Sequence, residues 1–213
     1  MDTTAMLTRP WLRFYDPGVP HTLTYPQITV PSFLDETAAQ FGDHPATVFF
    51  GARLSYRTLQ TLVDRFATGL IRLGIRPGDR VSLHLPNCPQ FLIAYYGTLK
   101  TGAIAVPFNP LYTEREIERQ LADSGAEVAI TLDLVYPRLA AARPKTRVRE
   151  VVVTPINAYF PPLLRWLYPL KASREGHVVR VPRDVHTFQT LLETSPTQRA
   201  MAVDPDQPAV LLY

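Results

Sequence analysis

Histidine and cysteine are the side chains of this 213-residue sequence best suited to acid–base, nucleophilic or metal chemistry. The histidines stand at His21, His44, His84, His177 and His186, and the one cysteine is Cys88. A zinc site needs such side chains at a characteristic short spacing. No two histidines show that spacing, and Cys88 adds nothing to them. We therefore expect no metal-binding residues in this chain.

Phosphate and acyl chemistry also lack their usual loops. The ten glycines never occur as Gly-x-Gly, which argues against a dinucleotide-binding fingerprint and a glycine-rich phosphate loop. The sequence contains no Gly-Lys-Ser or Gly-Lys-Thr, and no serine stands in a Gly-x-Ser-x-Gly elbow. We assign no catalytic and no cofactor-binding residue here, and expect no cofactor to bind this chain tightly.

The remaining reactive side chains each have a structural interpretation that we favour. His84 lies between two leucines of an expected strand and fits a buried structural histidine. Cys88 lies near an expected helix start, where a thiol pKa can fall, but a small buried filler explains it as well. Glu114 and Glu118, one helical turn apart and interleaved with arginines, fit a solvated face.

The composition describes an ordinary globular chain, with 46% hydrophobic and 19% charged residues and a net charge of +3. A single cysteine excludes an internal disulfide and indicates a reducing compartment. No apolar run approaches the roughly 18–20 residues of a membrane span, and the first residues do not follow the order of a signal peptide. A cytoplasmic protein fits best.

The charge is unevenly distributed. Residues 137–183 contain ten basic and two acidic residues, a net charge of +8, so the rest of the chain carries −5. The sequence around residues 160–171 combines leucines and aromatics with basic residues, which is typical of a helix lying on an anionic membrane. We name as membrane-facing candidates Phe160, Leu163, Leu164, Arg165, Trp166, Leu167 and Lys171.

Two alternatives to membrane contact stay open for this segment. Its apolar face can pack on the protein body while the charges are merely solvated. Nucleic-acid binding is a weaker alternative, because no reading motif accompanies the charge.

Strands and helices alternate along most of the chain. Apolar spacing predicts a helix over 56–73, and further helices over 32–41, 87–102, 113–124 and 133–141. Strands are expected at 46–50, 53–55, 80–85, 103–106, 127–131 and 149–154. This alternation predicts an α/β fold with a layered, mostly parallel sheet, flanking helices and right-handed crossovers.

The first 31 residues differ from the rest. Prolines at high density exclude a regular helix there, so we expect an extended arm that lies across the body, with its aromatic side chains as anchors. We therefore divide the chain into this arm (1–31) and an α/β region (32–213) that contains the basic amphipathic segment (about 137–183).

An ordered series of motifs runs along the chain: LSYRTL at 54–59, LGIRPGDRV at 73–81, LPNCPQF at 85–91, LKTGAIAVPFNPLYT at 99–113, Glu116-Ile117 and LADSGA at 121–126. Together these motifs resemble the N-terminal portion of the adenylate-forming ligases, which include acyl-CoA synthetases, luciferases and nonribosomal adenylation domains. The arm and the segment from 151 to 188 resemble bacterial long-chain fatty-acid–CoA ligases.

The resemblance implies a two-step reaction for the parent enzyme. A fatty-acid carboxylate would attack ATP to give an acyl-adenylate and pyrophosphate, with Mg²⁺ and coenzyme A as further requirements and AMP as the second product. In this family residues 208–213 would lead into the ATP phosphate loop. We therefore expect an N-terminal fragment, incomplete at its C-terminal end and inactive alone, in which no family catalytic residue has a match.

Several functional alternatives stay open beside this reading. The parent could act on another carboxylate, or form only the acyl-AMP, and the chain could be a non-catalytic binding or membrane-docking module. A homodimer is also left open.

Three side chains are candidates for a substrate channel. Asn87 follows one expected strand, and Phe108 and Asn109 follow the next. Ligands of open α/β sheets bind at the carboxyl ends of the strands, which is where these residues fall. The alternative is that all three serve turns and helix caps.

Overall fold

The computed structural model describes residues 9–174, 182, 185–195 and 203–213, and its centre is a parallel sheet of five strands. The strands are β3 (Arg80–His84), β4 (Ile104–Pro107), β5 (Val128–Leu132), β6 (Glu150–Thr154) and β7 (His186–Thr187). Their order across the sheet is β4-β3-β5-β6-β7, and every neighbouring pair is parallel. The predicted α/β class is confirmed.

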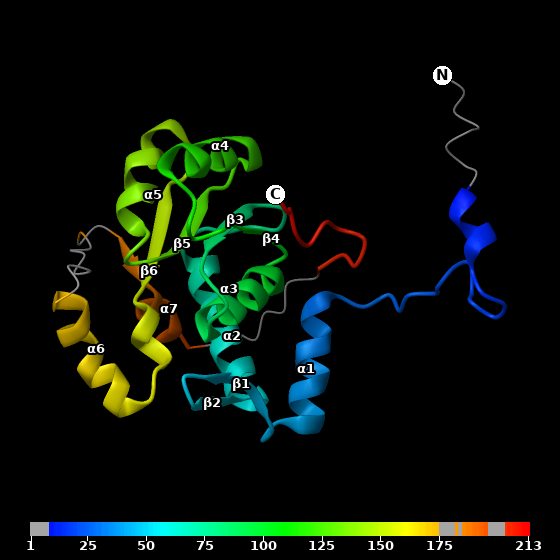
Figure 1. Ribbon diagram of the computed structural model, residues 1–213, viewed down its shortest axis with the longest axis horizontal. Coiled ribbons are helices and arrows are strands. Elements are labelled where there is room, and N and C mark those ends of the chain that lie inside the picture. The colour runs from blue at the N-terminus through cyan, green and yellow to red at the C-terminus, as the bar shows by residue number, and fades with distance from the viewer. Residues whose placement is uncertain (1–8, 175–181, 183–184, 196–202) are drawn as a thin grey trace.

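Helices cover both faces of this sheet (Figure 1). One layer consists of α2 (Tyr56–Arg72), which packs on α3 (Pro89–Lys100), on α7 (Phe188–Leu192) and on α1 (Val30–Phe41). The other contains α4 (Glu114–Ser124) and α5 (Tyr136–Ala142), which pack on each other. From β3 the chain crosses first to β4 and then back past β3 to β5, so right-handed crossovers place α3 and α4 on opposite faces.

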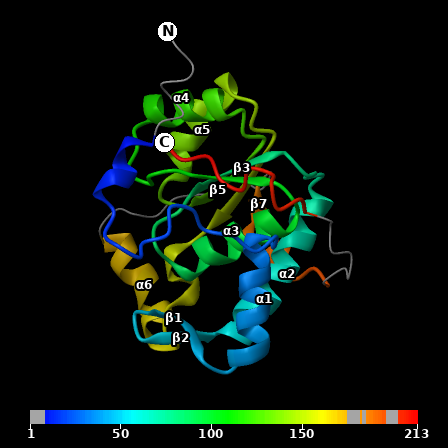
Figure 2. The ribbon, with the colours of Figure 1, turned by 90° about the vertical axis from the view of Figure 1, so that its right-hand side faces the viewer.

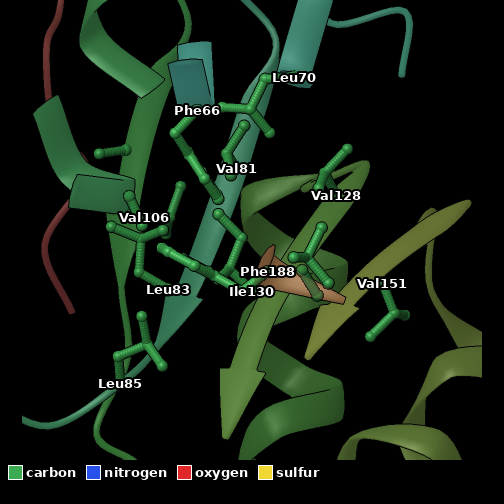
Figure 3. Close-up of a cluster of buried hydrophobic side chains, with 14 of the residues drawn as sticks. Phe66, Leu70, Val81, Leu83, Leu85, Val106, Val128, Ile130, Val151 and Phe188 are labelled. Carbon is green, nitrogen blue, oxygen red and sulfur yellow. The ribbon is translucent and has the colours of Figure 1, made fainter. Parts of the chain in front are cut away.

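The core lies between α2 and the sheet. Phe66 and Leu70 of α2 meet Val81 and Leu83 of β3, and none of the four side chains has measurable exposure (Figure 3). The ring of Phe66 stacks on Phe188 of α7, with centroids 4.4 Å apart. Burying one such side chain contributes about 1.5–3 kcal/mol, so this layer fixes the sheet against α2.

Helix ends follow the sequence signals at some places and depart from them at others. Thr113 and Glu116 form the predicted capping box, and Gly125, with a φ of 62°, ends α4 in the left-handed conformation. Helix α1 begins at Val30 instead of residue 32, since a proline fits the first helical turn. The residue that caps α3 is Cys88 instead of the expected Asn87, and Pro89 opens the helix.

We expected the N-terminal arm to lie across the body, but it does not. Residues Pro10–Phe14 form a short 3-10 helix, η2, and the arm runs away from the sheet (Figure 1). Its side chains Trp11, Phe14 and Tyr25 are 54%, 74% and 72% exposed, so they anchor nothing within the described residues. Contact with the body begins only at residues 28–31, which line a cleft with the end of α3.

The outer edge of β4 is covered by residues 209–211. The N–H of Ala105 donates to Ala209 at 2.9 Å, and the N–H of Leu211 donates to Ala105 at 3.0 Å. The pairing is parallel and limited to one bridge, between Ala105 and Val210. These residues therefore extend the sheet beyond β4.

Much of the expected basic surface is used inside the fold. The guanidinium of Arg149 donates to the carbonyls of Leu73 and Gly74 at the end of α2. Arg143 donates to the carbonyls of Val148 and Arg149. Arg138 donates to the carbonyl of Tyr112, and Lys145 pairs with Glu118. Arg180 and Arg183 lie outside the described residues.

The helix predicted near residue 160 is α6 (Pro162–Arg174), which follows the 3-10 helix η4 (Ile156–Tyr159). Pro169 stands inside α6 and has no N–H to donate to the carbonyl of Arg165. The side-chain amide of Asn157 donates to that carbonyl instead, at 3.3 Å. A residue of η4 thus replaces the hydrogen bond that the proline removes.

Asn157→Ala is expected to lower the free energy of unfolding by about 1 kcal/mol, because the carbonyl of Arg165 loses its donor. In a Pro169→Ala background the same change should cost much less, since residue 169 then supplies the N–H. Urea unfolding of the four chains measures both costs. Equal costs in the two backgrounds would contradict this account of the Asn157 side chain.

Candidate functional site

The carboxyl ends of β3 and β5 form the candidate site. The order β4-β3-β5 means that the chain leaves β3 in one direction and β5 in the other, which is a topological switch point. Open α/β sheets bind ligands at such points. The site is surrounded by the loops at 85–88 and 133–135 and by the first turn of α3.

His84 ends β3 and is the most unusual side chain of this region. It has no exposed surface, and neither ring nitrogen has a hydrogen-bond partner among the described residues. Its ring packs edge-on against Phe108, with centroids 4.5 Å apart. Burial lowers the pKa of the imidazole to about 3, so it is neutral at physiological pH and cannot act there as a charged group.

Gln90 and Thr47 also carry a buried polar atom without a partner among the described residues. Gln90, in the first turn of α3, donates to the carbonyl of Pro155 after β6 at 3.0 Å, but its Oε1 accepts nothing among the described residues. The Thr47 hydroxyl on β1 is also buried and unpartnered there. Such groups are rare in folded proteins and mark places for water or ligand contact. Gln90 follows the loop after β3, and Thr47 lines one groove with Asn87 and Cys88 of that loop.

A mostly apolar groove of about 270 Å³ opens between the β1–β2 hairpin, β1 (Pro45–Phe49) with β2 (Ala52–Ser55), and the start of α3. It is lined by Thr47, Val48, Phe49, Asn87, Cys88, Pro89, Phe91 and Leu92. The hairpin supplies one wall and the first turn of α3 the other. The groove can therefore accommodate an apolar chain next to the end of β3.

Cys88 behaves as the small buried side chain that we favoured. It is 6% exposed, and burial raises the pKa of its thiol above the ordinary value. Burial also raises the pKa of Tyr159, which interacts with Cys88. A protonated thiol is a poor nucleophile, so Cys88 supplies packing at the groove instead of reactivity.

The three channel candidates do not share one surface. Asn87 is exposed and lines the groove beside the hairpin. Phe108 is 4% exposed, between His84 and the ring of Tyr213. Asn109 is exposed, and its Oδ1 accepts the N–H of Leu111 at 3.0 Å, as in an Asx turn. Only Asn87 thus meets a described groove.

The loop after β5 contributes one carboxyl group. Burial raises the pKa of Asp133, and the N–H of Leu134, which donates to its Oδ1 at 2.9 Å, partly offsets this effect. Among the described residues no three His, Cys, Asp or Glu side chains gather closely enough to hold a metal ion. Asp133 therefore belongs to no such cluster among the described residues.

The membrane-facing candidates are mostly exposed. Leu163, Leu164, Arg165, Trp166, Leu167 and Lys171 lie on α6 with exposed side chains. Phe160 precedes α6 instead of belonging to it, and its half-buried ring packs against Phe49 and Phe50 of the hairpin. None of the described helices is both long and apolar enough to cross a bilayer.

Sequence reasoning missed Gln90, Thr47 and the role of the hairpin. Gln90 stands in the first turn of a helix, where a polar side chain normally meets water, so nothing local showed that it is buried. One signal was available for the hairpin. The pair Phe49-Phe50 before Gly51 places an aromatic residue in an expected turn, which is unusual.

Comparison with known proteins places this geometry in a family. Residues 34–213 match the family described as AMP-binding enzymes. A long-chain-fatty-acid–CoA ligase of Bacillus subtilis (strain 168) is 37% identical over 209 residues, which is 96% of this chain and 37% of that protein. A ligase of the same name from Yersinia pestis is 35% identical over 92% of this chain and 35% of its own.

Solved structures of ligases have a similar fold. The crystal structure of a long-chain-fatty-acid–CoA ligase from Archaeoglobus fulgidus superposes with a TM-score of 0.72 over 93% of this chain and 36% of that one, at 23% identity. The chain thus spans about a third of the length of the curated relatives it matches. With the parallel sheet, its switch point and the match over 34–213 together, the chain belongs to the family of AMP-binding enzymes.

Proposed function

We propose that this chain is the N-terminal part of an AMP-forming long-chain fatty-acid–CoA ligase. The observation that supports this most is the 37% identity with the Bacillus subtilis ligase across nearly the whole chain. The whole protein would activate a fatty acid with ATP, releasing pyrophosphate, and then transfer the acyl group to the thiol of coenzyme A, releasing AMP. We place this protein in the cytoplasm.

ATP and Mg²⁺ do not fit the residues at hand. The sequence has no glycine-rich phosphate loop, and the described residues offer no cluster of three potential metal ligands. We therefore assign both to parts of the whole protein that lie outside these 213 residues. The present chain supplies the sheet, its helices and the groove beside Asn87.

We further propose Asn87, Phe108 and Asn109 as walls of the substrate channel. Asn87 has the strongest support, because its side chain is exposed in a groove of apolar character. Phe108 would act through its packing on His84 and Tyr213, and Asn109 through the turn that it stabilises. Asn87→Ala in the whole enzyme should lower kcat/KM for the substrate in this groove.

The test compares the 213-residue chain with the whole protein encoded by the same gene. With palmitate, ATP, Mg²⁺ and coenzyme A, the whole protein should form acyl-CoA and AMP, and the 213 residues alone should form neither. Turnover by the 213 residues, or none by the whole protein with any fatty acid, contradicts the proposal.

The same assay separates the alternatives. Preference for benzoate or a medium-chain acid indicates another carboxylate–CoA ligase. Acyl-AMP that accumulates with coenzyme A present indicates a fatty acyl-AMP ligase. Light scattering of the whole protein tests whether it forms the homodimer that the sequence leaves open.

A further inference from the structure

The tip of the β1–β2 hairpin and helix α6 both expose large apolar side chains. We name these side chains together the hairpin–α6 surface and define it by Val48, Phe50, Leu163, Trp166, Leu167 and Leu170. Phe160, which precedes α6, lies between the two elements: its ring centroid is 4.4 Å from that of Phe50 and 5.5 Å from that of Tyr168 on α6. Figure 2 shows the hairpin beside the lower end of α6.

The apolar stripe of α6 faces outward. Leu163, Trp166, Leu167 and Leu170 recur at the helical spacing that normally marks a core-facing stripe. Instead these side chains are 39–72% exposed, and Ala172 is the one buried residue of the helix. A stripe of this width on the outside of a protein marks a contact site.

The hairpin tip holds an aromatic ring in a costly backbone conformation. Phe50 has a φ of 50°, followed by Gly51 with a φ of 89°, a turn that favours Asn-Gly. A bulky side chain is strained in the left-handed region. Burial does not compensate for this strain, because Phe50 is 63% exposed. The strained turn therefore presents an aromatic ring at the tip of the hairpin, near Val48.

The charge of both elements has one sign. Neither the hairpin (residues 45–55) nor residues 156–174 contain an Asp or Glu, whereas they contain Arg53, Arg165, Lys171 and Arg174, all exposed. Exposed leucine and tryptophan among cations is the pattern of a surface that enters the headgroup region of an anionic bilayer. We propose that the hairpin–α6 surface docks on anionic lipid membranes, with Phe50 and Trp166 inserted.

Docking on lipid is independent of the ligase chemistry proposed above, because it needs only this surface. It also has a consequence for the groove at Asn87. That groove shares Val48 with the docking surface, so docking would place its mouth next to the lipid phase, where long acyl chains partition.

Vesicle co-sedimentation of the 213-residue chain tests the proposal. It should bind vesicles of phosphatidylserine and phosphatidylcholine, and bind less at high salt and to phosphatidylcholine alone. Trp166→Ser and Phe50→Asn should each weaken binding by about ten-fold, the effect of withdrawing one large apolar side chain. Leu111→Ser is the matched control, since Leu111 is 79% exposed outside the surface and should change nothing.

Phe50→Asn also separates binding from folding. Asparagine tolerates the left-handed conformation, so urea unfolding of this variant should show unchanged or higher stability while lipid binding falls. Arg165→Glu with Arg174→Glu should remove the preference for anionic vesicles. No binding at either salt, or binding unaffected by Trp166→Ser and Phe50→Asn, overturns the proposal. So does self-association without vesicle binding, which would assign the surface to a second copy.

Discussion

Replacing His84 with leucine is expected to stabilise the protein at neutral pH and to make it far more resistant to acid. At neutral pH the change removes two buried ring nitrogens that have no partner among the described residues, a gain of about 1–3 kcal/mol. Leucine is of similar size and suits the apolar contact with Phe108. The neutral-pH gain therefore comes from removing polar atoms without creating a cavity.

The acid effect follows from the two pKa values of His84. The unfolded chain binds a proton there as the pH falls below about 6.5, whereas the folded chain does so only near 3. The stabilisation that depends on a neutral His84 is therefore complete above pH 6.5. Between pH 6.5 and pH 3 the ratio of folded to unfolded chain falls about tenfold for each pH unit. The total loss is of the order of 5 kcal/mol, and leucine at position 84 abolishes it.

Acid unfolding followed by circular dichroism measures this difference. The midpoint of His84→Leu should lie about one pH unit below that of the unchanged chain. His21→Gln is the control, because His21 is exposed and its loss should leave the midpoint in place. Coinciding curves for His84→Leu and the unchanged chain would show that the imidazole is not buried uncharged.

Lys100→Met is expected to cost about 2–4 kcal/mol of unfolding free energy, although Lys100 belongs to no candidate site. Its ammonium lies 2.6 Å from Oδ1 of Asp35 on α1 and 2.6 Å from Oδ1 of Asp64 on α2. Burial acts to lower the pKa of Lys100, but these hydrogen bonds outweigh it and raise the pKa. The stabilisation is therefore present at neutral pH and lost only at strongly alkaline pH. Methionine would leave two carboxylates facing each other without a cation.

A mutant cycle isolates this interaction. In an Asp35→Asn, Asp64→Asn background, Lys100→Met should cost less than half as much by urea unfolding. Lys145→Met is the matched control, since Lys145 pairs with Glu118 at the surface, where solvent screens the pair, and its loss should cost much less than that of Lys100. If Lys100→Met and Lys145→Met lower the free energy of unfolding equally, Lys100 does not join the three helices.

The elements with local signals could be predicted closely. The helix expected at 56–73 is Tyr56–Arg72, because its apolar spacing and the cap at Ser55 are both local. The four inner strands lie within about a residue of their expected positions, since continuous apolar runs between turns leave little choice. The parallel arrangement followed from the alternation of these elements.

Features that depend on distant residues could not be predicted. Gln60 and Asp64 are polar residues of the helix expected at 56–73, and nothing in the sequence indicated that Gln60 would bind Asp35 of α1 or that Asp64 would bind Lys100 of α3. The charge of residues 137–183 gave no indication that Arg149 would bind carbonyls at the end of α2. At the candidate site, the position of Asn87 at a strand end was predictable, but the groove that it lines needs the hairpin.

The pairing of residues 209–211 with β4 has a consequence for the order of folding during synthesis. Ala105 and Val210 are half the chain apart, so the edge of β4 leaves the ribosome long before its cover exists. An uncovered strand edge is a template for pairing with another chain. The interval of translation between these residues is therefore the period in which the nascent protein is most prone to aggregate, and in which a chaperone would have most effect.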